Sequence, residues 1–160
     1  MHKIKIGKKC KIHKSVVLGE PGFGFQRDDK GYTKPLKRRP HPFGVIIGKH
    51  VEIGSHSRVH RGRWRDTVIG DGTKIDSGVH VAHNDVIGRN CIIVAGTVIG
   101  GSVTIGDECF IAENVSIKDG LKIARNTTIG MGAVVIKDIK KPNTTWVGNP
   151  AHKLYDKQVF

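Results

Sequence analysis

Aliphatic residues recur along this chain at a spacing of six. From Ile69 to Val135 every sixth position holds Ile or Val without a miss. The same spacing appears earlier in two shorter runs, Ile6, Ile12 and Leu18, then Ile47, Ile53 and Val59. A fixed short period predicts a repeat architecture in which each unit stacks on the one before it. We call these aliphatic positions the anchors.

The residues between the anchors predict short strands joined by sharp corners. The position four after each anchor is mostly small or β-branched, which suits inward packing in a strand; it holds Thr73, Val79, Asp85, Cys91, Thr97, Val103, Cys109, Val115, Leu121, Thr127 and Ala133. The position three after each anchor, from Gly72 to Gly132, is Gly or Asn in nine of eleven cases. Those two residues tolerate positive φ, so each six-residue unit is expected to end in a corner.

These patterns predict an all-β fold, a parallel β-helix of hexapeptide repeats with a triangular section and three repeats in each coil. Backbone hydrogen bonds would then run between coils, and each buried anchor would contribute roughly 1.5–3 kcal/mol. Residues 1–160 are expected to form a single domain. Two insertions interrupt the repeat: a protruding loop from about residue 19 to 44, and four extra residues around Arg63–Asp66. The segment from about 149 to 160 is expected to be a short tail or helix.

Charge and cysteine content narrow the functional classes. There are 27 Lys and Arg against 14 Asp and Glu, a net charge of +13 with His neutral, so an anionic partner is expected. Three cysteines, an odd number, favour a reducing compartment, and Cys10, Cys91 and Cys109 all stand four after an anchor, where they are expected to be buried. No apolar stretch suggests a signal peptide or a membrane span, so we expect a cytoplasmic protein.

The position two after each anchor should point outward at a corner, and reading it at every third repeat follows each edge of the triangular prism. One edge, Asp71, Arg89, Asp107 and Arg125, alternates in charge and suits solvent. A second edge reads Ser77, Ala95, Glu113 and Met131. The third reads His83, Gly101, Asp119 and Lys137. An exposed imidazole can accept a proton near neutral pH, and a glycine N–H one coil later can stabilise an oxyanion. His83 is therefore either a catalytic base or an ordinary solvated corner histidine.

Four segments resemble the UDP-3-O-acylglucosamine N-acyltransferases of lipid A synthesis: Gly22-Phe-Gly-Phe25, Val59-His-Arg-Gly62, Asp66-Thr-Val-Ile-Gly-Asp-Gly72 and Val79-His-Val-Ala-His-Asn84. The resemblance implies a left-handed winding, against the usual right-handed crossover. It also implies a homotrimer with active sites between subunits, and a nucleotide-sugar substrate. His83 would be the general base, and Gly101 would supply the oxyanion N–H.

The chain also departs from that family, and the departures bear on the acyl donor. Because the repeat begins at Ile4 to Ile6, we expect no counterpart of the family's N-terminal uridine-binding domain, and none of its extended C-terminal helices. The segments 130–138 and 147–151 are similar to sugar N-acetyltransferases that use acetyl-CoA. That likeness places coenzyme A, as co-substrate, against the following residues, with Lys141 or Lys153 near its phosphates: Gly101, Asp119, Gly120, Met131 and Lys137.

The expected sugar-nucleotide site draws on the first loop and on the first coils. Aromatic and basic residues of the loop suit a base and phosphates, although Phe23 or Phe25 could instead anchor the loop to the prism; the candidates are Phe23, Phe25, Arg27, Tyr32 and the basic run at 37–39. Arg61 shares the corner offset of His83 and is a candidate to bind the sugar or diphosphate. By the same resemblance His60, His80 and Asn84 complete the set. His60 stands where the family has Asp.

Asp85 is the one acidic residue at an inward position, where a carboxyl group costs stability unless it is hydrogen-bonded. It either orients His83 or caps the turn, and the sequence leaves both open.

The predicted function is transfer of an acetyl group from acetyl-CoA to the amine of a UDP-linked amino sugar, with no metal. A longer acyl chain donated by acyl carrier protein is the first alternative. A zinc carbonic anhydrase of the same fold needs three converging imidazoles, and His56, His60, His80 and His83 lack the spacing. A nucleic-acid-binding module would fit the charge but shows no recognised motif. A purely structural subunit is the last alternative.

Overall fold

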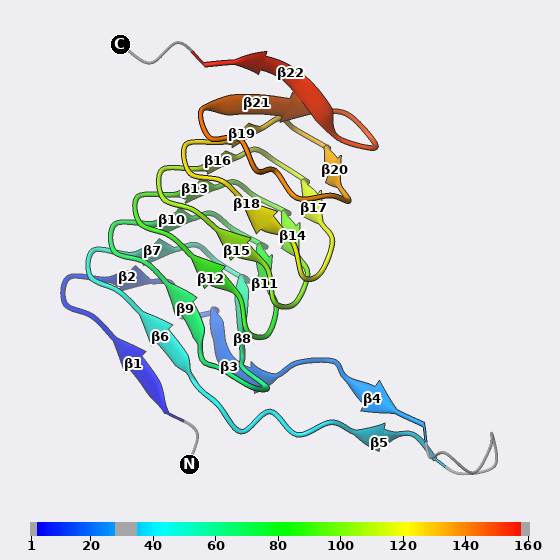
Figure 1. The fold of residues 1–160 in the computed structure, drawn as a ribbon. Helices are drawn as coiled ribbons and strands as arrows, with labels where there is room; N and C mark the ends of the chain where they lie inside the picture. Colours follow the sequence, from blue (N-terminus) through cyan, green and yellow to red (C-terminus); the bar gives the residue numbers. More distant parts are fainter. Residues whose placement is uncertain (1–2, 28–34, 158–160) are drawn as a thin grey trace.

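A computed structural model describes residues 3–27 and 35–157 and shows a β-helix built from three parallel sheets (Figure 1). The first sheet holds β1 (Ile4–Ile6), β6 (Val45–Ile47), β9 (Thr67–Ile69), β12 (Val86–Ile87), β15 (Thr104–Ile105) and β18 (Lys122–Ile123). The second holds β2 (Lys11–Ile12), β7 (Glu52–Ile53), β10 (Lys74–Ile75), β13 (Ile92–Ile93), β16 (Phe110–Ile111), β19 (Thr128–Ile129), β21 (Thr144–Val147) and β22 (His152–Asp156). The third holds β3 (Val17–Pro21), β8 (Arg58–Arg61), β11 (His80–Val81), β14 (Val98–Ile99), β17 (Ser116–Ile117) and β20 (Val134–Val135).

The register between strands confirms the coil of three repeats. Ile87 on β12 pairs with Ile105 on β15, and Ile105 pairs with Ile123 on β18. All twelve anchors from Ile69 to Val135 are buried, none more than 3% exposed. All eleven predicted corner residues from Gly72 to Gly132 have positive φ, between 51° and 77°. The hexapeptide pattern therefore fixes both the inside of the prism and its corners.

Both insertions lie where the sequence places them. The first leaves the third sheet after β3 and returns into β6; within it β4 (Phe25–Gln26) and β5 (Lys37–Arg38) pair antiparallel to form an arm that projects from the prism (Figure 1). The second forms a loop between β8 and β9, residues 62–66, which we call the short loop. Tyr32 lies outside the described residues.

Of the two expected forms of the C-terminal segment, a tail or a helix, the helix is wrong for residues 152–156, which form β22 (His152–Asp156). β22 pairs antiparallel with β21 at the last coil (Figure 1). The last strand of a parallel stack exposes unpaired N–H and C=O groups, and a returning strand satisfies them where a helix would not. Among the described residues no helix is long and apolar enough to cross a membrane.

The cysteines are free thiols in structural positions. Cys91 and Cys109 are buried as expected, whereas Cys10, in the first coil, is only half-buried. Each buried thiol donates to a backbone carbonyl of the next coil, Cys91 to Gly106 at 3.2 Å and Cys109 to Ala124 at 3.2 Å.

The neighbouring isoleucines of β13 give a direct test of the anchor rule. Ile93 is 0% exposed and Ile92 is 46% exposed. We expect Ile93→Ala to lower the free energy of unfolding by about 2–5 kcal/mol, because it leaves a cavity in the prism. Ile92→Ala, the same change one residue away, should cost less than about 1 kcal/mol. Urea denaturation of both variants measures the difference, and equal losses would contradict the assignment of inside and outside.

Candidate active site

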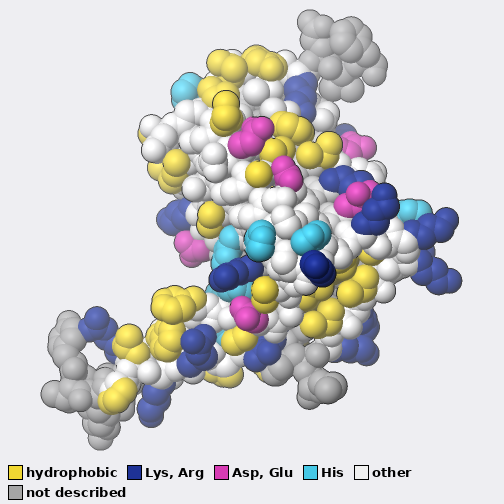
Figure 2. All heavy atoms as spheres, turned by 180° about the vertical axis from the view of Figure 1, so that it is seen from behind, with side chains coloured by type: hydrophobic (Ala, Val, Ile, Leu, Met, Phe, Trp, Pro, Cys, Tyr) yellow, Lys and Arg dark blue, Asp and Glu magenta, His cyan; other side chains and the backbone are white. Residues whose placement is uncertain are grey.

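Four histidines gather where the arm, the short loop and the third edge of the prism meet. His60 lies on β8, His80 on β11, His83 at the corner after β11, and His41 on the stretch that returns from β5 to β6. The ring centroids of His60 and His80 are 4.8 Å apart, and those of His41 and His83 are 5.1 Å apart. Figure 2 shows His side chains close together on this face, above the base of the arm.

A pocket of 560 Å³ opens beside His83. Its walls come from three separate parts of the chain, namely the arm, the short loop and the corners of the third edge. The lining residues are Phe23, Gly24, Phe25, Arg39, His41, Arg63, Trp64, His83, Gly101, Ser102, Asp119 and Gly120. Such a mixture of aromatic, cationic and small residues suits an anionic ligand with a flat ring.

The His83 ring lies between two glycines that leave room for it. A Cβ atom on Gly101 would lie 2.7 Å from Cε1 of His83, and one on Gly22 would lie 2.6 Å from Cδ2. The N–H of Ser102 donates to the His83 carbonyl at 2.9 Å, so the two corners are stacked one coil apart. Among the described residues no acceptor receives the Gly101 N–H. The expected vertical register of imidazole and free glycine amide is therefore present.

Asn84 sets the orientation of the His83 ring. Its Oδ1 accepts the backbone N–H groups of Arg63 at 2.6 Å and Trp64 at 3.1 Å, which leaves its Nδ2 as the group that faces His83. Nδ2 lies 2.6 Å from Nδ1 of His83 and 3.2 Å from Oγ of Ser102. Because an amide nitrogen can only donate, the neutral imidazole holds its lone pair on Nδ1 and its proton on Nε2. The short loop thus fixes the resting tautomer through Asn84.

Burial and neighbouring cations keep the histidines neutral. Desolvation is the main reason that the pKa of His83 lies below its usual value, with His41 and Arg63 adding to the effect. Desolvation also lowers the pKa of His41 and of His80, and it lowers the pKa of His60 to about 4. A neutral imidazole retains a lone pair at physiological pH, which a proton acceptor requires.

The structure decides between the two interpretations of Asp85. Its Oδ1 accepts the N–H of Val103 at 2.9 Å, one coil later, and the carboxyl group is fully buried. The hydrogen bond that orients His83 comes from Asn84 instead. Asp85 therefore caps the corner from inside the prism.

The coenzyme candidates divide into two groups. Asp119 and Gly120 line the pocket with Gly101. Lys137 is exposed on the same edge, three coils from His83, or ~14 Å at the usual strand spacing. Met131, 72% exposed, lies at the corner between the second and third sheets, away from His83 in its own chain.

Lys141 and Lys153 lie at the C-terminal end of the prism, where both bind the Asp156 carboxylate, at 2.7 Å and 3.2 Å. The structure does not bring these two lysines to the pocket within one chain.

The substrate candidates lie at the base of the arm. The rings of Phe23 and Phe25 are 5.0 Å apart, and the Arg38 guanidinium stacks over Phe25 at 4.8 Å. Phe23 is 85% exposed, whereas Phe25 is half-buried and its ring contacts lie within the arm. Arg27 is exposed at the end of the described part of the arm.

Arg61 holds the base of the arm through its guanidinium. Its Nε donates to the His41 carbonyl at 2.8 Å, and another of its nitrogens donates to the Gly19 carbonyl at 3.2 Å. Both accepting residues belong to the first insertion, so this side chain ties the arm to β8.

Sequence reasoning missed His41, Arg63 and Trp64 as pocket residues. Trp64 packs edge-on against His83 at 5.9 Å between ring centroids, and Arg63 stacks on Trp64 at 5.3 Å. The available signal for His41 was its place between Pro40 and Pro42, where rigid backbone holds an imidazole in an otherwise basic loop. Nothing in the repeat pattern says which way an insertion folds.

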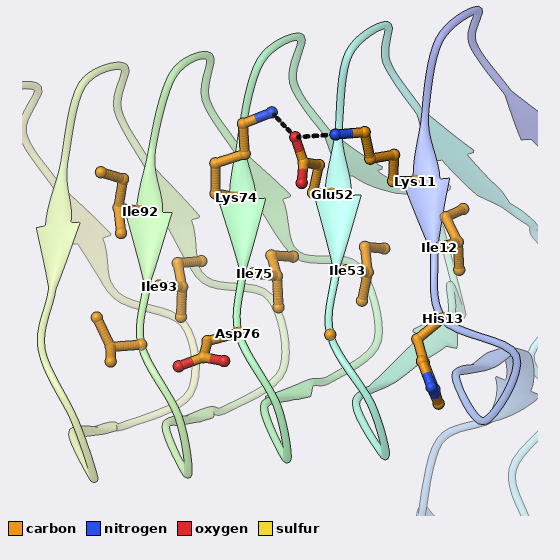
Figure 3. A pocket seen from close by; sticks show the side chains of 12 residues that line it. Lys11, Ile12, His13, Glu52, Ile53, Lys74, Ile75, Asp76, Ile92 and Ile93 are labelled. Carbon is orange, nitrogen blue, oxygen red and sulfur yellow. Dashed lines mark hydrogen bonds and ion pairs between the residues drawn. The ribbon is translucent and has the colours of Figure 1, made fainter.

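A second hollow, of 820 Å³, lies on the outer face of the second sheet (Figure 3). It runs over β2, β7, β10 and β13. Glu52 there accepts from Lys74 at 2.9 Å and pairs with Lys11 at 3.7 Å. Exposed pairs of this kind contribute ~0–1 kcal/mol each. This face is opposite the edge that carries His83, and the smaller pocket is therefore the candidate active site.

Within the described residues no cluster of three or more His, Cys, Asp or Glu could hold a metal ion.

Comparisons with known proteins find similar sequences. Residues 66–101 and 102–137 match the bacterial transferase hexapeptide (six repeats). The chain is 40% identical over 146 residues to a UDP-3-O-acylglucosamine N-acyltransferase of Methylorubrum populi, a match that covers 91% of this chain and 40% of that protein. It is 46% identical over 102 residues to a probable mitochondrial UDP-3-O-acylglucosamine N-acyltransferase 2 of Arabidopsis thaliana, covering 64% of this chain and 33% of the relative. The chain thus spans less than half the length of these relatives.

Solved structures share the fold. The crystal structure of UDP-N-acetylglucosamine O-acyltransferase from Moraxella catarrhalis superposes with a TM-score of 0.83 at 23% identity, covering 98% of this chain and 57% of that one. Another UDP-N-acetylglucosamine acyltransferase superposes with a TM-score of 0.82 at 28% identity, covering 96% and 56%.

The low pKa of His60 predicts a pH dependence of stability. The unfolded chain binds a proton at His60 below about pH 6.5, while the folded chain does so only near pH 4, so stability is lost as pH falls through this window. We expect His60→Gln to flatten the curve of urea midpoint against pH between 6.5 and 4. An unaltered slope in His60→Gln would show that His60 is protonated in the folded protein.

Proposed function

We propose that this chain, which resembles hexapeptide-repeat acyltransferases in sequence and in fold, transfers an acyl group from a thioester to the amine of a nucleotide-linked amino sugar. The observation that carries the proposal is the stack of His83 and Gly101 inside the pocket. One group there can accept a proton, and the other presents a free N–H one coil above it.

The reaction proceeds by direct attack. The sugar amine forms a C–N bond to the thioester carbonyl carbon, and the carbonyl oxygen becomes an oxyanion that the Gly101 N–H stabilises. His83 takes the proton that the amine loses. Collapse of the intermediate breaks the C–S bond, and the thiolate leaves with the proton that His83 returns to it.

The hydrogen bond from Asn84 affects how His83 acts as a base. In the resting site Nδ1 accepts from Asn84 and Nε2 carries the proton. For Nε2 to accept a proton from the amine, the ring must first hold its own proton on Nδ1, which breaks the bond from Asn84 at a cost of about 1 kcal/mol. Asn84 is therefore a positioning residue with a measurable effect on the base.

The surroundings of the pocket support a nucleotide-linked substrate. Arg39 and Arg63 line it with Phe23 and Phe25, which gives cations for a diphosphate and a ring for a base to stack on. Uridine is favoured because the relatives are named for UDP-linked glucosamine. His60 and His80, whose rings are 4.8 Å apart, are not among the residues that line the pocket.

The donor is a phosphopantetheine thioester, the chemistry common to acyl-CoA and acyl carrier protein. We propose acetyl-CoA, lying along Gly101, Asp119, Gly120 and Lys137 of the third edge. A longer acyl chain on acyl carrier protein is the second candidate, favoured by the names of the relatives.

We further propose a cytoplasmic homotrimer. In it Met131, which lies on another corner of its own chain, would line the pocket of a neighbouring subunit, and so could Lys141 and Lys153. The three free cysteines suit a reducing compartment.

Replacing His83 tests the mechanism. We expect His83→Ala to lower kcat/KM by ~10²–10⁴ through loss of general-base catalysis, with the melting temperature and oligomeric state unchanged. His152→Ala, an exposed histidine on β22, is the matched control and should retain full activity. Free thiol release from acetyl-CoA or long-chain acyl carrier protein, with a panel of UDP-linked amino sugars, measures turnover and separates the two donors. Turnover that survives in His83→Ala would overturn the mechanism.

Replacing Asn84 by Asp tests the control of the base. The new carboxylate keeps the bonds to Arg63 and Trp64 and accepts a hydrogen bond from Nδ1–H of His83, which raises the pKa of the imidazole. We expect the acidic limb of the profile of kcat/KM against pH to move to higher pH in Asn84→Asp. A limb that stays in place would mean that a group other than His83 titrates in the rate.

A further inference from the structure

Asp85 is a fully buried carboxyl group inside the prism, at the inward position four after anchor Val81. Its Oδ2 has no hydrogen-bond partner among the described residues. A buried carboxylate oxygen without a donor is costly, so this atom requires an explanation.

Other polar side chains at the same offset show what this position does. Four of them donate to a backbone carbonyl 15 residues later, in the next coil: Thr73 to Gly88, Cys91 to Gly106, Thr97 to Ala112, and Cys109 to Ala124. The hydroxyl of Ser57 does the same to Asp76, with the four residues of the short loop added to the count. Thr127, beside the last coil, departs from this pattern and donates to Ala124, three residues earlier.

Two of the threonines at this offset also accept a backbone N–H from the residue one coil later. Thr73 accepts from Cys91 and Thr97 accepts from Val115. Asp85 fulfils this half of the pattern, since Oδ1 accepts from Val103. The donation to a carbonyl has no counterpart at Asp85 among the described residues, because its Oδ2 has no hydrogen-bond partner. The same count of 15 residues from Asp85 leads to the carbonyl of Gly100.

An ionised carboxylate cannot make the second bond of this pattern, the donation to a backbone carbonyl. An ionised Oδ2 would set a negative oxygen against the partial negative charge of a carbonyl in a dry interior, whereas a protonated Oδ2 would donate to it. We propose that Asp85 is a neutral carboxylic acid whose Oδ2–H donates to the carbonyl of Gly100, and that this bond fixes the Gly100–Gly101 peptide above His83. Its catalytic consequence rests on the proposed function, because the same peptide carries the Gly101 N–H.

The electrostatic surroundings agree with a neutral acid. Desolvation raises the pKa of Asp85 well above its usual value, against the smaller opposing effect of backbone N–H groups and of Arg65. Arg65 is the charged side chain whose field reaches Asp85, and its Nε donates to the Asn84 carbonyl at 2.8 Å rather than to the carboxyl group. A donor on the Gly100 carbonyl also polarises the peptide and makes the Gly101 N–H a better donor.

The protonation state can be measured without reference to activity. Infrared difference spectra of the wild type against Asp85→Asn at pH 7 should show the carbonyl stretch of a protonated carboxylic acid. Stability adds a second readout, because the folded chain retains a proton that the unfolded chain loses above about pH 3.9. The folding equilibrium of the wild type should weaken by about tenfold per pH unit relative to Asp85→Asn as pH rises from about 4, until the folded Asp85 itself ionises. A carboxylate band and parallel stability curves would overturn the proposal.

The positioning of the peptide is tested with three replacements. Asp85→Asn keeps one acceptor and one donor, and Asp85→Thr reproduces the side chain of Thr73 and Thr97. Asp85→Val keeps the shape and removes both bonds. We expect the first two to retain kcat within about threefold and the third to lower kcat by about tenfold or more, with KM nearly unchanged, as for loss of one oxyanion contact.

These outcomes separate this inference from the proposed function. Should no acyl transfer be found, the infrared band and the stability curves still decide whether Asp85 is protonated. Should Asp85→Asn lose activity as severely as Asp85→Val while remaining folded, an ionised carboxylate is required and the neutral acid is excluded.

Discussion

The structure depends on one constraint, the packing of an aliphatic anchor into the prism at every sixth residue. Each anchor lies directly above another from the previous coil, because three units of six bring the chain back to the same sheet. The interior accepts only this register, since a slip of one residue would turn the anchors outward and bury the corner residues. Corner side chains three repeats apart must then stack. Every relation between residues on an edge, including that of His83 with Gly101, follows from this requirement.

The candidate site uses the regular prism as a support and gains its chemistry from the irregular segments. The prism supplies His83, the Gly101 amide and the exposed corner above them. The arm and the short loop supply His41, Trp64 and the arginines that enclose the ring and lower its pKa by removing water and adding positive charge. Without them the corner would be open to solvent, and the imidazole would be an ordinary surface histidine.

Polar groups inside the prism link this support to the chemistry. Parallel coils leave backbone groups at each corner with no partner inside the ladder, and the inward Thr, Ser and Cys side chains satisfy them. Asp85 occupies that place in the coil that carries His83. A carboxyl group there is a departure from an otherwise uniform interior, and in our proposal it holds the peptide that joins Gly100 to Gly101.

The sequence alone determined the coil length, the buried anchors, the positive φ corners and the stacking of His83 under Gly101, because all four follow from a period that is local and repeats without error. It also located both insertions, but it did not place His41 or Trp64, or show that Asn84 rather than Asp85 holds the His83 ring. The sequence also did not predict the strand β22 after the last anchor, because β22 pairs with an edge that exists only once the stack of coils is complete. Contacts between an insertion and a distant coil depend on where the folded prism puts its surfaces, and no period in the chain encodes that.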